Sequence, residues 1–243
     1  MKKTSGGGEY VPQDRGDRMR PRASHPRYWQ LKLLLQKLRH VTESALIPTG
    51  GKLLDYGCGD RPYESLFRTK FEEYIGADLP GNDKAELTIG RHGEVPQDDE
   101  SVNCVLSTQV LEHVEDPAAY LSEAYRMLEP GGYLILSTHG FWPYHPDPTD
   151  FWRWTMDGLH RQIGQAGFEI VLTQAVFGLT SVAIQLWQDA TSGFLPPRLR
   201  KFYVSFIQAI IGWIERRDPD KCSPNASVFV VLARKVRGPM SAG

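Results

Sequence analysis

Two glycines and a carboxylate are the first residues whose types and spacing suggest a binding site. An apolar run at 52–56 leads directly into Gly57 and Gly59, a pattern typical of a buried parallel strand followed by a tight turn. In an open α/β sheet, ligands bind at the carboxyl ends of the strands, where the first turn must let the backbone come close to the ligand. Asp78 ends the next apolar run, where a carboxylate can accept hydrogen bonds from both hydroxyls of a ribose. The spacing therefore predicts a nucleoside site.

The same turn argues against a dinucleotide. The G-x-G-x-x-G fingerprint requires a third glycine where Pro62 stands, and the Lys-Ser/Thr pair of a phosphate-binding loop is missing. A nucleoside without a diphosphate is the ligand that this turn favours. Paired glycines also occur in ordinary tight turns, so the prediction depends on Asp78 and on Asp55, which precedes the turn and can fix the loop or meet a cationic amino group.

A second group of reactive side chains lies between residues 138 and 155, the densest run of aromatic, histidine and aspartate residues in the chain. It follows an expected strand, which brings it to the same edge of the sheet as the glycine turn. Its histidines, His139 and His145, are the side chains best matched to proton transfer at neutral pH. The alternative is a structural loop over the sheet, with Asp150 and Arg153 as a local ion pair.

Composition argues against several classes of function. The chain has 243 residues, of which 41% are hydrophobic, and this suits one α/β core with an insertion better than two domains. A net charge of -1 gives no reason to expect nucleic acid as a partner. Three cysteines without a C-x-x-C pair favour a reducing, cytoplasmic compartment, and we expect no metal. We expect no secretion signal, and the most apolar window, 202–214, is shorter than the roughly 20 residues that span a membrane.

Hydrophobic periodicity predicts that strands and helices alternate along the chain. In several windows apolar residues recur every three or four positions, and short apolar runs stand between these windows. Helices are expected at 26–46, 63–69, 118–128 and 159–166, and strands at 52–56, 74–78, 102–107, 133–137, 168–173 and 228–234. This order is typical of an α/β fold with a mostly parallel sheet.

The chain divides into a tail and one domain. Residues 1–25 are basic, rich in glycine and proline and too poor in large apolar residues to fold on their own, so we expect a mobile tail. We expect 26–243 to form a single domain, with a helical insertion at about 178–224 before the last strand. Within it, an apolar stripe at 203–214 has basic residues at both ends, over 198–217. We favour a lid helix that packs on the core, and the alternative is peripheral contact with a membrane surface.

Four motifs, taken in order, resemble those of a known family. They are Leu53-Leu54-Asp55-Tyr56-Gly57-Cys58-Gly59, Gly76-Ala77-Asp78, the stretch from Pro96-Gln97-Asp98 to Gln109-Val110-Leu111-Glu112-His113-Val114, and Leu128-Glu129-Pro130-Gly131-Gly132-Tyr133-Leu134. Over about 53–173 the chain resembles the class I S-adenosylmethionine-dependent methyltransferases of the ubiquinone/menaquinone type. The loop at 138–155 resembles a bacterial subgroup associated with cell-surface polysaccharide biosynthesis.

The resemblance implies both a fold class and a cofactor. The fold is a Rossmann-like α/β sheet of seven strands, mostly parallel with the last strand antiparallel, with helices on both faces. The cofactor is S-adenosyl-L-methionine, with Gly57 and Gly59 near its methionine part, Asp78 at its ribose and the loop after Ser107 beside its sulfonium. The full set of expected cofactor residues is Asp55, Gly57, Cys58, Gly59, Asp78, Leu79, His92, Ser107 and Gln109.

Arg91 departs from the family pattern. Members often have an aspartate at this position, where it meets the adenine amino group. We therefore expect adenine to be held by the His92 backbone and by packing from Leu79. The departure also leaves open an alternative from a different class, a cofactor-binding pseudoenzyme that serves as an interaction module.

Methyl transfer to a hydroxyl of a small or glycan-linked acceptor is the function that we expect. An in-line displacement mainly needs positioning and desolvation, together with a base for the hydroxyl proton. His145 is the first candidate for the base and His139 the second, with Asp150 ordering their loop, whereas His113 is interpreted as structural. Acceptor binding is expected from Trp142, Tyr144, Trp152 and Arg153. A lipid or prenylated quinone, methylated at the inner face of a membrane, is the alternative acceptor.

Overall fold

The computed structural model describes residues 18–217 and 222–236. The strands are β1 (Lys52–Tyr56), β2 (Glu73–Asp78), β3 (Leu87–Thr88), β4 (Val102–Thr108), β5 (Leu128–His139), β6 (Phe168–Val176) and β7 (Val228–Lys235). The helices are α1 (Tyr28–Glu43), α2 (Glu64–Phe67), α3 (Pro117–Met127), α4 (Met156–Gln165), α5 (Leu179–Thr191) and α6 (Pro197–Glu215), with short 3₁₀ turns η1 (Leu111–His113) and η2 (Ser192–Phe194).

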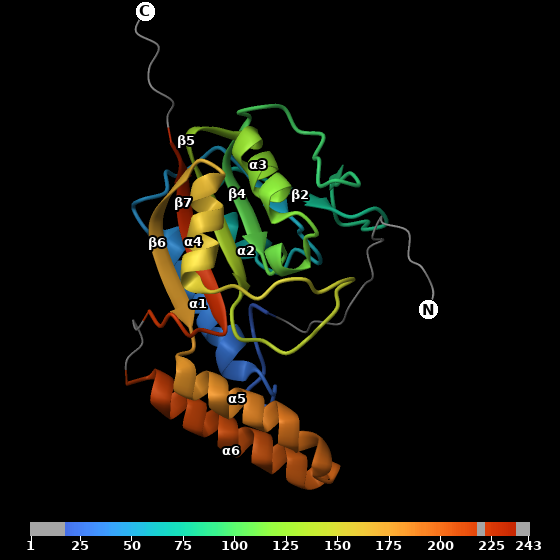
Figure 1. Ribbon diagram of the computed structural model, residues 1–243, viewed down its shortest axis with the longest axis vertical. Coiled ribbons are helices and arrows are strands. Elements are labelled where there is room, and N and C mark those ends of the chain that lie inside the picture. The colour runs from blue at the N-terminus through green and yellow to red at the C-terminus, as the bar shows by residue number, and fades with distance from the viewer. Residues whose placement is uncertain (1–17, 218–221, 237–243) are drawn as a thin grey trace, which may run out of the picture.

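One sheet of seven strands forms the centre of the molecule, in the order β3-β2-β1-β4-β5-β7-β6 (Figure 1). The strands from β3 to β5 in this order pair in parallel. β7 is antiparallel to both of its neighbours, β5 and β6. The predicted fold class is thereby confirmed.

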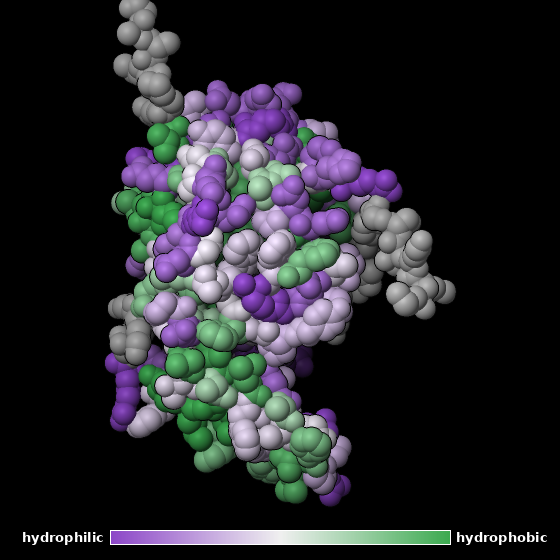
Figure 2. Space-filling model, in the orientation of Figure 1, coloured by the Kyte–Doolittle hydropathy of each residue, from purple (hydrophilic) through white to green (hydrophobic). Residues whose placement is uncertain are grey.

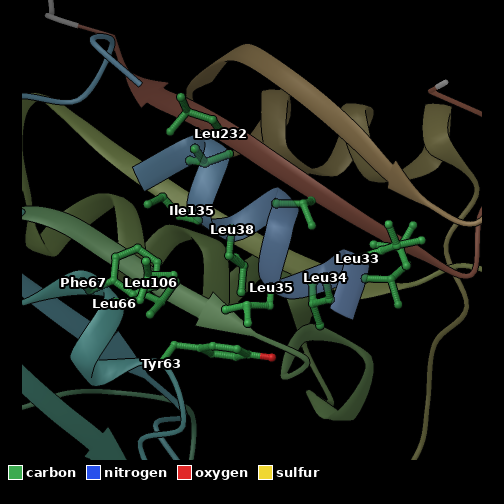
Figure 3. Close-up of a cluster of buried hydrophobic side chains, with 14 of the residues drawn as sticks. Leu33, Leu34, Leu35, Leu38, Tyr63, Leu66, Phe67, Leu106, Ile135 and Leu232 are labelled. Atoms are coloured by element: carbon green, nitrogen blue, oxygen red, sulfur yellow. The ribbon is translucent and has the colours of Figure 1, made fainter. Parts of the chain in front are cut away.

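Helices cover both faces of the sheet, and each face has its own core. On one face, α1 and α2 bury Leu38 and Phe67 against Leu106 and Ile135 of the central strands (Figure 3). On the other face, α3 and α4 pack against the same strands, with Leu121 and the neighbouring apolar residues inaccessible to solvent. Burying both faces explains why the central strands read as continuous apolar runs rather than alternating ones.

Two helices begin at side-chain caps that the sequence provides. Asp116 accepts hydrogen bonds from the backbone N–H groups of Ala118 and Ala119 at 3.0 and 3.1 Å, at the start of α3. Thr155 accepts one from the Gly158 N–H at 3.1 Å, at the start of α4. Such caps satisfy N–H groups that have no partner within the helix. The second cap fixes the point where the 138–155 loop ends.

The structure departs from the expected elements at three places. α2 is a single turn, shorter than the helix expected at 63–69. β5 begins at Leu128 rather than at residue 133, because a register shift against β4 and the positive φ of Gly131 (+87°) carry the Pro-Gly-Gly sequence through as an irregularity of the strand. β3 has only two residues and was not predicted.

The helical insertion is a hairpin of α5 and α6, which extends from one end of the molecule (Figure 1). It lies within the range expected at 178–224, of which 218–221 fall outside the described residues. Of the expected tail, 1–17 also lie outside them, and Met19 packs against the core beside α1. Among the described helices, none is long and apolar enough to cross a membrane.

Candidate active site

Four parallel strands bring the predicted site residues to one edge of the sheet. Gly57 follows β1, Asp78 ends β2, Thr108 ends β4 and His139 ends β5. The chain leaves β1 for β2 on one side, whereas β4 pairs with β1 on the other side. This reversal of strand order is the place where open α/β sheets bind their ligands.

The glycine turn wraps over the end of β2. The N–H groups of Gly57 and Cys58 both donate to the carbonyl oxygen of Ala77, at 2.8 and 3.0 Å. Gly57 has a φ of +84°, and a Cβ added there would lie 2.5 Å from a methyl carbon of Val110. Only glycine meets both conditions without strain. The turn borders a small hollow beside β1.

Asp78 ties this turn to β2. Its Oδ2 accepts hydrogen bonds from the Gly59 N–H and from Asn82 Nδ2, both at 2.7 Å, and its Oδ1 accepts from the Leu79 N–H at 2.7 Å. A carboxylate has roughly four acceptor positions, so Oδ1 keeps about one for a ribose hydroxyl. A second ribose bond requires Asn82 to give up its place on Oδ2. No motif along the chain pointed to Asn82.

Asp55 lies below the turn and is 2% exposed. Its Oδ2 accepts a hydrogen bond from the Tyr74 hydroxyl, and its Oδ1 is buried without a hydrogen-bond partner among the described residues. Burial raises the pKa of the Asp55 carboxyl to about 7. A buried carboxylate oxygen without a partner fits a ligand that brings a cationic amino group to the turn.

The hollow itself is lined by residues that were expected and by others that were not. The lining is Arg18, Gly57, Cys58, Gly59, Asp60, Pro62 and Thr108. Thr108 stands where Ser107 was expected, because the Ser107 side chain is fully buried and its hydroxyl lies 2.9 Å from the Tyr120 hydroxyl. Strand alternation explains the difference, since neighbouring residues face opposite sides of a sheet.

The other predicted cofactor residues, Gln109, His92 and Leu79, lie after the ends of β4, β3 and β2. Gln109 has a positive φ of +59° and directs its amide to the Ser137 hydroxyl at 3.2 Å. The His92 N–H, expected to meet adenine, donates to Glu94 within its own loop at 3.0 Å. Leu79 is half-buried and follows Asp78 directly. Their contacts with a cofactor stay predictions.

A buried carboxylate and three imidazoles form a cluster at the ends of β4 and β5. Glu112 is fully buried, and its Oε2 accepts a hydrogen bond from the Thr138 hydroxyl at 2.8 Å. Its Oε1 lies 2.7 Å from His139 Nδ1 and 4.0 Å from His113 Nε2. Burial opposes ionisation of Glu112, but the charge and contact of His139 outweigh it and lower the pKa of this carboxyl to about 2.

His145 completes the cluster from the 138–155 loop. Its ring centroid lies 4.7 Å from that of His139 and 4.9 Å from that of His113, so the structure unites the two histidines predicted as bases with one that was assigned a structural role. Burial, followed by the two neighbouring histidines, lowers the pKa of His145 to about 4. Its imidazole is therefore neutral at neutral pH. Ligand atoms of Glu112, His113 and His145 lie within 4.8 Å of one another and could hold a metal ion.

The predicted ion pair between Asp150 and Arg153 is present and orders the loop. Arg153 donates to both carboxylate oxygens of Asp150 at 2.6 Å, and to the carbonyl oxygens of Trp142 and Pro143 at 2.8 Å. Asp150 also accepts the His145 N–H at 2.8 Å, and its carboxylate lies 3.5 Å from His145 Nδ1. All three guanidinium nitrogens are thus engaged within the loop, so Arg153 positions His145 rather than facing open solvent.

Some aromatic side chains of the loop are packed or hydrogen-bonded, and others are exposed to solvent. Trp142 is stacked on His139 with centroids 4.5 Å apart, and the Arg27 guanidinium lies 4.0 Å from its ring centroid. Trp152 donates its indole N–H to the Val114 carbonyl oxygen at 2.8 Å. Tyr144 is 76% exposed. A second, smaller hollow lies between Trp142 and α5.

The sequence of the chain is similar to those of known methyltransferases. A family model described as a methyltransferase domain matches residues 27–173. A protein of Mycolicibacterium smegmatis, named "Probable S-adenosylmethionine-dependent methyltransferase", is 29% identical over 179 residues, which are 67% of each chain. The ubiquinone biosynthesis O-methyltransferase of Cereibacter sphaeroides is 34% identical over 109 residues, and this match spans 39% of the present chain and 44% of that enzyme.

Solved structures share the fold at low sequence identity. The cyclase SpnF has a TM-score of 0.57 and 19% identity, over 97% of this chain and 88% of that one. Geranyl diphosphate C-methyltransferase from Streptomyces coelicolor, solved with S-adenosyl-L-homocysteine, has a TM-score of 0.54 and 16% identity, over 96% and 88% of the two chains. At such identities the likeness extends to the fold alone.

Proposed function

The chain belongs to the methyltransferase-domain family, and from that premise we propose that it methylates a hydroxyl group of a small or glycan-linked acceptor. The activity itself, methyl transfer dependent on S-adenosylmethionine, follows from the family and from the relatives that share it. The hydroxyl is supported by the matched segment of the ubiquinone biosynthesis O-methyltransferases. The observation that carries the proposal is the cluster of Glu112 and three histidines at the ends of β4 and β5, at the same edge of the sheet as the glycine turn.

The chain holds its cofactor at the hollow beside β1. Gly57 and Gly59 let the backbone approach the amino acid portion, Asp55 offers its unused Oδ1 to the amino group, and Asp78 offers Oδ1 to the ribose. When bound, the cofactor supplies a methyl group activated on a sulfonium. The loop at 138–155 follows β5 at the same edge of the sheet, so its residues would receive an acceptor beside this site.

His145 accepts the hydroxyl proton. The cofactor would give up its methyl group with the electrons of the S–C bond left on sulfur, and an acceptor oxygen that bonded to this group would hold its own proton as a strong acid. A weak but neutral base therefore suffices, and the lowered pKa of His145 keeps it neutral. We assign proton transfer to Nε2, which requires the tautomer that directs Nδ1–H to the Asp150 carboxylate at 3.5 Å rather than the one in which Nδ1 accepts from Arg153 Nη2 at 3.4 Å. The carboxylate of Asp150 then faces the resulting imidazolium.

The loop supports an acceptor that bears a ring. Tyr144 offers an exposed aromatic face next to His145, and such faces stack on sugars and other rings. The ion pair of Asp150 with Arg153 fixes the loop before binding, which lowers the entropy cost of ordering it. This arrangement supports a glycan-linked hydroxyl better than a flexible aliphatic one.

Methyl labelling of a cell extract tests the proposal. Protein incubated with extract and cofactor labelled in its methyl group should place the label in a polar carbohydrate fraction, where it resists alkali because it forms an ether. Label that alkali releases would indicate a carboxyl acceptor and contradict the proposal.

A lipid-linked acceptor is the second candidate, favoured by the exposed apolar side chains of α5 and α6. It predicts that the labelled product partitions into organic solvent. Cofactor binding without label transfer to any fraction would instead indicate a pseudoenzyme.

A further inference from the structure

The α5–α6 hairpin exposes large apolar side chains that no residue in the described part of the chain covers. On α6, Phe202 is 77% exposed, Phe206 64%, Leu199 58% and Trp213 52%, and at the turn Phe194 is 85% exposed. Figure 2 shows apolar surface gathered over the hairpin, whereas the main body is largely polar in the same view. Contiguous exposed apolar surface of this kind marks a site of interaction.

These residues form one stripe along α6, which we call the outer stripe: Leu199, Phe202, Phe206 and Trp213. At 3.6 residues per turn, their spacing confines them to roughly 60° of the helix circumference. Val204, Ile207 and Ile211 lie on the opposite side and are buried, and Ile207 and Ile211 belong to the same core cluster as the leucines of α1. The helix is thus apolar on two faces. Packing within the described part of the chain accounts for the inner face but not for the outer one.

The middle of the hairpin is fixed to the body by a buried glutamine network. The side-chain amides of Gln185, Gln188 and Gln208 all donate to the carbonyl oxygen of Pro26, at 3.2, 2.7 and 2.8 Å. An ion pair of Arg27 with Asp189 at 3.2 Å adds to this attachment. The exposure of the outer stripe is therefore a feature of an anchored element.

Cations accompany the outer stripe. Residues 179–217 contain five basic side chains and two acidic ones, in a chain whose net charge is -1. Arg198 and Arg216 fall beside the stripe on the helix surface, and the Arg217 guanidinium lies 3.5 Å from the centroid of the Trp213 ring. One of the two acids, Asp189, is already paired with Arg27.

We propose that the outer stripe and Phe194 dock the protein on an anionic lipid surface. Aromatic and leucine side chains enter the boundary between headgroups and acyl chains, and the flanking arginines meet anionic headgroups, as in amphipathic helices that lie on membranes. We infer a lipid surface because the arginines beside the outer stripe are complementary in charge to anionic headgroups. The proposal is independent of the acceptor. The inner face of α6 packs on the core, as expected of the predicted helix, and the proposal concerns its outer face alone.

Vesicle flotation tests the proposal with the full-length chain. The protein should float with vesicles of mixed phosphatidylglycerol and phosphatidylcholine, and much less with phosphatidylcholine alone. Added salt should weaken the binding, since it screens the arginines. Phe202→Ser combined with Phe206→Ser should lower the bound fraction at least tenfold, and Arg198→Glu should lower it only on anionic vesicles.

Matched controls separate docking from misfolding. Leu46→Ser removes an exposed apolar side chain away from the hairpin, and Arg161→Glu reverses an exposed charge on α4, so both should bind vesicles like the wild type. The melting temperatures of the variants should agree. Equal flotation of the Phe202/Phe206 variant and the wild type would overturn the proposal. So would self-association that these substitutions abolish in the absence of any vesicle binding, since the stripe would then join two copies.

Discussion

Replacing Asp78 tests the cofactor site most sharply. In Asp78→Ala the cofactor loses the ribose bond to Oδ1, and a hydrogen bond to a charged group contributes about 1.5–3 kcal/mol. We expect the dissociation constant for S-adenosylmethionine to rise about 10- to 150-fold. Calorimetry on the wild type and the variant measures it. NAD should bind neither protein, because Pro62 stands where the diphosphate-binding turn requires a third glycine.

Asn82 supplies the matched control for Asp78. Its amide occupies one acceptor position of Asp78 Oδ2, so Asn82→Ala frees that position for the second ribose hydroxyl. This variant should bind the cofactor as tightly as the wild type or more tightly. Asp78→Ala also removes the acceptor of two backbone N–H groups, so its melting temperature should fall and binding should be measured well below it. Unchanged affinity in folded Asp78→Ala would refute the assignment.

Four further outcomes follow from the site. Because the pKa of Asp55 is about 7, its carboxylate gains charge as the pH rises from 6 to 8, so affinity for the cationic cofactor should increase over this range; calorimetry should show no such increase for Asp55→Asn. Gly57→Ala should abolish cofactor binding, since its Cβ would collide with Val110 at a positive φ. Asp150→Asn should raise the KM for the acceptor and lower kcat, because Arg153 loses its charged partner. Dialysis against EDTA should leave turnover unchanged, and a loss restored by one divalent metal would assign the Glu112 cluster to that metal.

Local patterns predicted most of the fold because local physics decides it. The apolar runs that became β1, β2, β4 and β7 are buried on both faces, and nothing in the tertiary structure opposes their preference. The start of β5 was predicted too late, because Pro130 and the two glycines after it normally end an element, whereas here a strand irregularity carries them. β3 was missed since two residues give no periodicity.

The candidate site was predictable in its parts but not in their arrangement. His139 and His145 were chosen by residue type and by position after a strand, and the structure places both in one cluster. Glu112, which links this cluster, belongs to a motif interpreted as structural, and no spacing along the chain shows that it meets His139 across two strands. The structure likewise has Thr108 at the hollow, whereas Ser107 is buried. Predicting which of the two faces the hollow requires knowing the exact end of β4.

The central claim, that the loop after β5 removes the acceptor proton, is tested most directly by single-turnover rates of His145→Ala. With the acceptor identified by labelling, the rate should fall at least about 100-fold, the usual contribution of a general base, while cofactor affinity stays within about twofold. His40→Ala, an exposed histidine on α1, should react like the wild type. At saturating cofactor, the wild-type rate should decline only as the pH approaches 4, where His145 becomes protonated. A His145→Ala enzyme with the wild-type rate and pH profile would contradict the account.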